Sequence, residues 1–143
     1  MKKEFEKFVI SLAAIIIRNN KCLILEYAKY SKMWGLPGGR IDKGEFVAGE
    51  SLRRELEEEL GLSNFKNLGV VDYDISWNSE DHAKCNIILL IENDSDEIKI
   101  SPEHIQLKWI GEDEINNYQF RWDNMERVIK NGFKYHKLLN NEK

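Results

Sequence analysis

Apolar runs divide the first part of the chain into two short strands. Residues 8–17 and 22–27 are apolar almost throughout and rich in β-branched side chains, whereas residues 18–21 have the composition of a turn. This pattern predicts a hairpin. Because a strand with one face in water would alternate apolar and polar residues, we expect both strands to be covered on both faces.

The pattern then changes from a glycine-rich stretch to a helical period. Residues 34–39 read Trp-Gly-Leu-Pro-Gly-Gly. This predicts a tight turn, because proline fixes one φ and glycine adopts φ values closed to other residues. Residues 47–60 carry leucines four positions apart, which predicts an amphipathic helix with Gly61 as its C-terminal cap. The leucines are Leu52, Leu56 and Leu60.

The hydrophobic pattern in the second half of the chain predicts three strands and two helices. We expect strands over residues 68–77, 86–92 and 105–110, a short helix within 111–118 and an amphipathic helix over 123–139. Strands on both sides of one central helix predict an α/β fold in which a mixed β-sheet is sandwiched between α-helices. The apolar side of the last helix docks on the domain or, alternatively, forms a homodimer face. That side comprises Met125, Val128, Ile129, Phe133 and Leu138.

Length and composition favour one globular domain spanning residues 1–143. Apolar residues make up 42% of the 143 positions and charged residues 32%, which excludes the collagen-like and disordered classes. There are 21 Lys and Arg against 25 Asp and Glu, a net charge of −4. This balance argues against a protein that binds long nucleic acid through a basic patch.

The N-terminal apolar run and the cysteines favour a cytoplasmic protein. The run at residues 8–17 is half as long as the roughly 20 residues that a membrane-spanning helix needs. No small-residue cleavage site follows it, so we expect neither a signal peptide nor membrane association. Cys22 and Cys85 lie far apart, without a second Cys or His at metal-ligand spacing. They are expected to be free, reduced thiols.

Residues 40–59 carry most of the net negative charge, with seven acidic and four basic residues. On a helix, Glu55, Glu58 and Glu59 share an arc of about 100°, and like charges this close destabilise a helix slightly. One interpretation is a solvated acidic face, eased by a pairing of Arg54 with Glu58. The other is a site for a hard cation such as Mg²⁺, which binds where carboxylates converge with substrate phosphates. The glycine-rich turn immediately upstream can bring backbone carbonyls to the same place, which favours the cation site.

The acidic segment also follows a spaced motif. Residues 39–62 read Gly39-x5-Glu45-x8-Arg54-Glu55-Leu56-x-Glu58-Glu59-x-Gly61-Leu62. This resembles the Nudix box of the MutT-like hydrolases, whose pattern is G-x5-E-x7-R-E-U-x-E-E-x-G-U, with U an aliphatic residue. One residue more than in the family pattern separates Glu45 from Arg54. It predicts a lengthened entry loop or a local bulge before the helix.

The resemblance implies a Nudix fold and a Mg²⁺- or Mn²⁺-dependent hydrolase. The expected substrate is a nucleoside diphosphate linked to another group, with a nucleoside triphosphate or a nucleotide sugar as the default. One alternative is a catalytically silent Nudix domain that binds a nucleotide as a sensor. The other is a hydrolase of a non-nucleotide diphosphate.

The resemblance also implies a set of metal ligands and a base. Glu58 and Glu59 are expected to be the principal ligands, joined by Glu55 and the backbone carbonyl of Gly38. The proton of the attacking water would pass to Glu55 or to an acid from a later loop, for which Glu103 is the candidate.

Three further residues have candidate roles around this site. Arg54 is expected to pair with the carboxylates of the box and to set their rotamers. Arg40 is a candidate phosphate contact, with an ordinary surface charge as the alternative. Trp34 is a candidate platform for a nucleobase, with hydrophobic packing as the alternative.

Overall fold

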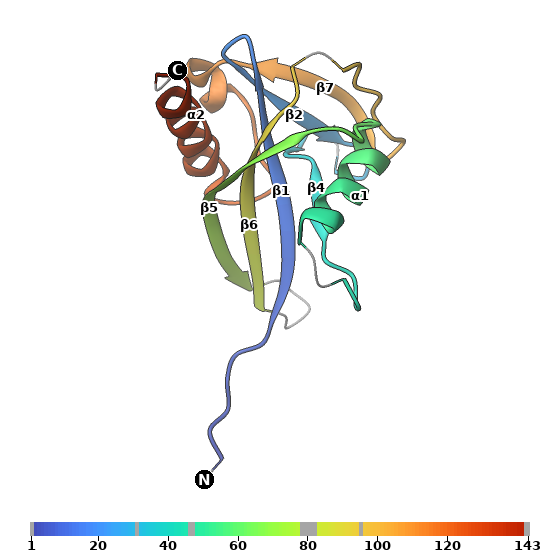
Figure 1. Cartoon of the computed structure of the whole chain (residues 1–143), viewed down its shortest axis with the longest axis vertical. Coiled ribbons are helices and arrows are strands. Elements are labelled where there is room, and N and C mark those ends of the chain that lie inside the picture. The colour runs from blue at the N-terminus through green and yellow to red at the C-terminus, as the bar shows by residue number, and fades with distance from the viewer. Residues whose placement is uncertain (1, 31, 46–47, 78–82, 95, 142–143) are drawn as a thin grey trace.

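The computed structural model describes residues 2–30, 32–45, 48–77, 83–94 and 96–141. A sheet lies between two helices, with the N-terminal residues extending away from it (Figure 1). The elements are β1 (Phe8–Arg18), β2 (Lys21–Tyr27), β3 (Trp34–Gly35), β4 (Gly38–Arg40), α1 (Ala48–Leu60), β5 (Lys66–Trp77), β6 (Ala83–Glu92), β7 (His104–Ile110), the 3₁₀ helix η1 (Glu112–Asn117) and α2 (Met125–Asn141).

Strand β1 is the centre of a mixed sheet. It pairs in parallel with β6, and β5 pairs antiparallel with β6 at the edge. The short strand β4 pairs antiparallel with β1 through Ser11↔Arg40, Leu12↔Gly39 and Ala13↔Gly38. At its far end β1 turns into β2, which pairs with β3 and β7. The glycines of β4 are thereby fixed beside the middle of the sheet.

The sheet separates two apolar clusters, because alternate residues of β1 point to opposite faces. On one face, Leu12 and its same-face neighbours pack against the three buried leucines of α1. On the other face, Ala13 and Ile15 pack against the buried residues of α2. Both faces of β1 are therefore covered, as its near-continuous apolar run predicts.

The predicted fold class is confirmed, and two details differ from the sequence analysis. Residues 34–39 form the short strands β3 and β4 as well as the turn between them, because both segments find an edge to pair with. Leu138 was wrongly placed on the packing side of α2 and is 50% exposed. Its spacing is helical, but the buried residues of α2 end at Phe133, so the last turns extend past the sheet. Residues 46 and 47, in the predicted entry loop, lie outside the described residues.

The two cysteines agree with the sequence analysis. Cys22 is buried and Cys85 half-buried, and both are free thiols. Desolvation raises the pKa of the Cys22 thiol to about 12, so it stays protonated and unreactive. Among the described residues, no helix is long and apolar enough to cross a bilayer.

Truncation of one α1 leucine tests how far this packing holds the helix in place. Leu56 is fully buried, so Leu56→Ala should lower the free energy of unfolding by about 3 kcal/mol in urea denaturation. The matched variant Leu138→Ala, on the exposed part of α2, should change it by less than about 0.5 kcal/mol. Equal losses in the two variants would contradict the assignment of both side chains.

Candidate active site

Helix α1 is joined to strand β4 by the carboxylate of Glu59. The amide N–H of Gly38 donates to Glu59 Oε2 at 2.9 Å, and Glu59 is only 8% exposed. Gly39 lies against the carboxylate of Glu55, where a Cβ atom would collide with it. Gly39 thus lets the strand approach the carboxylate of Glu55 more closely than any other residue would, and Gly38 lets it lie close against the backbone of Leu12 and Ala13 in β1.

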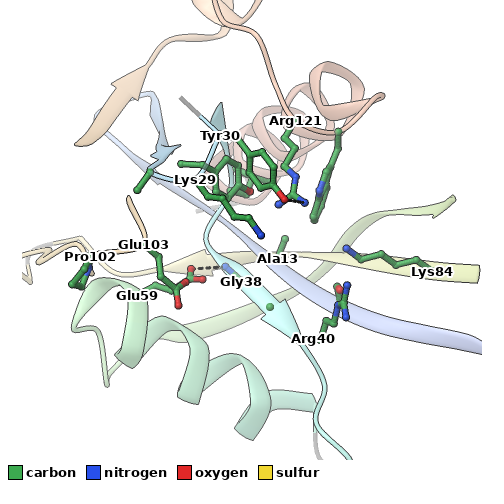
Figure 2. A pocket seen from close by; sticks show the side chains of 16 residues that line it. Ala13, Lys29, Tyr30, Gly38, Arg40, Glu59, Lys84, Pro102, Glu103 and Arg121 are labelled. Carbon is green, nitrogen blue, oxygen red and sulfur yellow. Dashed lines mark hydrogen bonds between the residues drawn. The ribbon is translucent and has the colours of Figure 1, made fainter. Parts of the chain in front are cut away.

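The loop before β7 is attached to the end of the same helix. The amide of Ser101 donates to the carbonyl of Glu59 at 3.0 Å, and the amide of Lys99 donates to that of Leu60 at 2.9 Å. On the other side, the carbonyl of Glu103 accepts from Ala28 N–H at 2.9 Å. These bonds hold Glu103 beside Glu59. The two carboxylates face each other at one end of a cavity (Figure 2).

The guanidinium of Arg54, on helix α1, forms ion pairs with four carboxylates. It lies 2.9 Å from Glu45, 3.0 Å from Glu55, 3.3 Å from Asp42 and 3.5 Å from Glu58. Two donors of Arg54 bond the two oxygens of Glu45, and this lowers the pKa of Glu45 to about 2. Glu45 therefore reaches Arg54 despite the extra residue between them.

The cavity has a volume of about 530 Å³, within the usual range for small-molecule sites. Gly38, Glu59 and Glu103 line one end. Figure 2 shows Arg40 and Lys84 at the other end and Lys29, Tyr30 and Arg121 above. Four cations line it, and in the described part of the chain none of them is ion-paired: Lys29, Arg40, Lys84 and Arg121.

The structure divides the predicted site residues into four groups. Gly38, Arg40, Glu59 and Glu103 line the cavity together. Glu55 lies just beneath them against Gly39, whereas Glu58 has a side chain that is 60% exposed and lines a separate surface hollow with Arg54. Trp34 is 6% exposed and packs edge-on against Tyr118 in the core, which favours its packing alternative.

Arg121 and Lys84 belong to the cavity, yet the sequence analysis missed both. The bonds Trp34 N–H to Gln119 carbonyl and Arg121 N–H to Trp34 carbonyl align residues 119–121 with β3. The guanidinium carbon of Arg121 then lies 3.9 Å from the ring centre of Tyr30. No motif spacing signals this, because it depends on a contact between segments more than 80 residues apart.

At the acidic end of the cavity, which Glu59 and Glu103 line, the pKa values of Glu59 and of the neighbouring Glu55 are raised. Burial raises the pKa of Glu59 to about 8, assisted by the charges of Glu55, Glu103 and Glu58 and opposed by the bond from Gly38. Burial also raises the pKa of Glu55, although Arg54 opposes this shift. Ionised forms of both carboxylates therefore gain from a nearby positive charge.

The donor set of this end fits a hard divalent cation. Glu59 is a buried carboxylate that accepts a hydrogen bond from the Gly38 amide, and Glu103 and Glu55 are further oxygen donors beside it. Mg²⁺ and Mn²⁺ prefer oxygen ligands of this kind. Among the described residues, no group of three His, Cys, Asp or Glu side chains is already arranged as a metal site.

Residues 8–131 match the sequence profile described as NUDIX domain, so the chain belongs to the NUDIX family. The resemblance inferred from residues 39–62 is thereby confirmed. No curated protein matches the chain.

Solved structures share the fold at low sequence identity. The ORF135 protein of E. coli is 20% identical, with a TM-score of 0.76 and 93% of this chain and 94% of that chain covered. A C. elegans Ap4A hydrolase is 18% identical, with a TM-score of 0.75 and 93% and 98% covered. The NUDIX domain of Shewanella oneidensis NrtR, complexed with ADP ribose, is 15% identical, with a TM-score of 0.71 and 94% and 90% covered.

The raised pKa of Glu59 predicts a pH-dependent stability. In the folded chain the carboxyl keeps its proton to about pH 8, whereas it loses it near pH 4.5 when unfolded. The stabilisation from Glu59 is therefore full below pH 4.5 and is lost as the pH rises to 8. In EDTA, Glu59→Gln should melt about 5 °C above the wild type at pH 8, with little difference at pH 4.5.

Differential scanning calorimetry of both proteins checks this prediction. Added Mg²⁺ should raise the melting temperature of the wild type at pH 8 and leave that of Glu59→Gln unchanged. Parallel melting curves at every pH would contradict the burial of an ionisable carboxylate at this position.

Proposed function

We propose that the chain hydrolyses the phosphoric anhydride bond of a nucleoside diphosphate derivative, with Mg²⁺ or Mn²⁺ as cofactor. A nucleoside triphosphate or a nucleotide sugar is the default substrate. One observation carries the proposal: a single cavity has carboxylates at one end and unpaired cations along the rest of its wall. A polyanion bridged to the carboxylates by divalent ions fits this distribution of charge.

The metal ligands in this proposal are Glu59, Glu58, Glu55 and the carbonyl of Gly38. Glu59 already lies in the cavity, and Glu55 needs only to leave Arg54 to join it. Glu58 is 60% exposed and lies 3.5 Å from Arg54, so it would reach the cavity by leaving this ion pair and changing rotamer. When bound, divalent ions would neutralise the diphosphate and lower the pKa of a water molecule.

Glu103 is the base that the geometry favours. Hydrolysis forms a bond from the water oxygen to phosphorus, breaks the bridging P–O bond and transfers a water proton to a carboxylate. Glu103 faces the cavity, whereas Glu55 lies beneath Gly39 in an ion pair with Arg54. Arg54 itself does not line the cavity, so it acts by positioning the carboxylates around it.

The cations along the wall bind and orient the phosphates. Arg40 extends from the strand that carries Gly38, and Arg121 is held against Tyr30 by ring stacking and by a bond from its Nη2 to the tyrosine hydroxyl at 3.2 Å. A guanidinium held in this way loses little side-chain entropy when it meets an anion. This makes Arg121 the strongest candidate for a fixed phosphate contact.

Substitution of Glu58 tests the metal assignment with little risk to the fold. Glu58→Gln removes a charge from an exposed side chain, so the protein should fold normally while kcat for Mg²⁺-dependent hydrolysis falls by about 100-fold or more. Glu57→Gln is the matched control on the same turn and should keep kcat within about 2-fold. Turnover is measured by mass spectrometry of the products of a panel of nucleoside triphosphates and nucleotide sugars.

The same panel of substrates distinguishes the proposed hydrolase from a silent sensor domain and from a hydrolase of a non-nucleotide diphosphate. Nucleotide binding without hydrolysis in Mg²⁺ or Mn²⁺ would contradict the proposal and favour a silent sensor domain. Hydrolysis of a non-nucleotide diphosphate alone would assign the second alternative. Unchanged kcat in Glu58→Gln would contradict the ligand role of that residue.

A further inference from the structure

A row of polar side chains crosses the sheet from this cavity to a neighbouring one. Arg40 of β4 is the register partner of Ser11 in β1, Ser11 is that of Asn86 in β6, and Asn86 is that of Asp74 in β5. Register partners lie on the same face of a sheet, so these four side chains share the face covered by α2. Lys84, two residues before Asn86, is on this face as well.

The middle of the row is buried and unpartnered. Ser11 is 2% exposed and Asn86 is 3% exposed, yet Ser11 Oγ and Asn86 Oδ1 find no hydrogen-bond partner among the residues that the structure describes. Asp74, in contrast, accepts from Asn124 Nδ2 at 3.1 Å and faces Arg127 at 3.6 Å. Two buried polar atoms without partners cost the free protein stability, and a ligand that reaches them recovers it.

The row begins in the cavity that Glu59 and Glu103 line. Ser11 lines that cavity, and Asn86 lines a neighbouring one of about 390 Å³. The two cavities share Lys84, Arg121 and Trp122 as walls. Lys84 Nζ lies 5.0 Å from the ring centre of Trp122, and burial lowers the pKa of Lys84, assisted by Arg40 and Arg121.

The chemistry of the row selects the kind of ligand. Phosphate oxygens only accept hydrogen bonds, so a phosphate leaves Asn86 Oδ1 without a partner. A nucleobase edge presents N–H donors beside oxygen and nitrogen acceptors, which match Asn86 Oδ1 and the donors Lys84 and Ser11. The flat face of Trp122 beside them is the type of surface on which bases stack.

We propose that Ser11, Lys84 and Asn86 form a base-recognition subsite, in which Asn86 Oδ1 accepts from an N–H group of the nucleobase. Lys84 and Ser11 donate to acceptors on the same edge, and Trp122 contacts its face. This inference rests on the proposed function, because it places the nucleoside of that substrate at the end of the cavity away from Glu59. It makes these residues, rather than the Nudix box, the determinants of which base is bound.

Binding of nucleoside monophosphates tests the subsite without any turnover. Calorimetry should give the wild type a preference of about 10-fold or more among AMP, GMP, CMP and UMP, and ribose 5-phosphate should bind more weakly than the preferred nucleotide. Asn86→Leu should weaken the preferred nucleotide by about 10- to 100-fold and leave ribose 5-phosphate unchanged. Ser11→Ala should act in the same direction, and Ser63→Ala, on an exposed serine outside the cavities, should have no effect.

The melting temperature separates recognition from a structural role. Because Asn86→Leu replaces an unpartnered buried amide by an apolar group of similar size, the free variant should melt at or above the temperature of the wild type. Equal binding of all five ligands by the wild type would overturn the proposal. Equal weakening of ribose 5-phosphate and the preferred nucleotide in both Asn86→Leu and Ser11→Ala would also overturn it.

The two proposals fail in different ways. If base-selective binding is lost in the variants but the wild type hydrolyses no diphosphate with Mg²⁺ or Mn²⁺, the subsite stands and the proposed function fails. If hydrolysis occurs without any base preference, the proposed function stands and the subsite is wrong.

Discussion

The hydrogen bond from the Gly38 amide to the buried Glu59 carboxylate is the contact on which the site depends. It joins the C-terminal turn of α1 to β4, and the carbonyls of the same turn hold the loop that carries Glu103. The leucines of α1 fix the other side of the helix in the core. Any movement of the helix would therefore displace Glu59, Glu55 and Glu103 relative to the glycine strand.

This arrangement is costly without a cation, because one amide does not replace the hydration of a carboxylate. The raised pKa values of Glu59 and Glu55 express that cost, whereas Glu45, bonded to Arg54, has a lowered pKa. Arg54 compensates the outer carboxylates and leaves the innermost one uncompensated. The acidic segment thus changes from ionised carboxylates paired with Arg54 to a buried carboxyl in the cavity, which has no cationic partner among the described residues and keeps its proton to about pH 8. We propose that a divalent ion completes this arrangement.

Much of the fold could be predicted from the sequence, because its signals are local. The leucine period gives α1, the apolar runs give β1 and β2, and Gly61 ends the helix with a φ of 69° and a bond from its amide to the carbonyl of Glu57. The motif also places the acidic end of the site beside the glycines, since it is contained within 24 consecutive residues.

The rest of the site depends on contacts between distant strands. Arg121 reaches the cavity because residues 119–121 align with β3, and Ser11 meets Asn86 only through the parallel register of β1 and β6. A shift of one residue in that register would move Asn86 to the opposite face. The net charge of −4 likewise does not reveal that four cations line one cavity. Sequence alone therefore locates the acidic end and Arg40, and leaves Lys29, Lys84, Arg121 and the proposed base-recognition subsite undetected.

We propose that a divalent cation replaces the proton on Glu59 when it binds. Titration of the metal-free protein with Mn²⁺ at pH 7, in buffers of different ionisation enthalpy, measures the number of protons released on binding. With a pKa of about 8 for Glu59, we expect the release of about one proton per protein, and close to none from Glu59→Gln. Tight binding of Mn²⁺ without proton release, or equal release from Glu59→Gln, would contradict it.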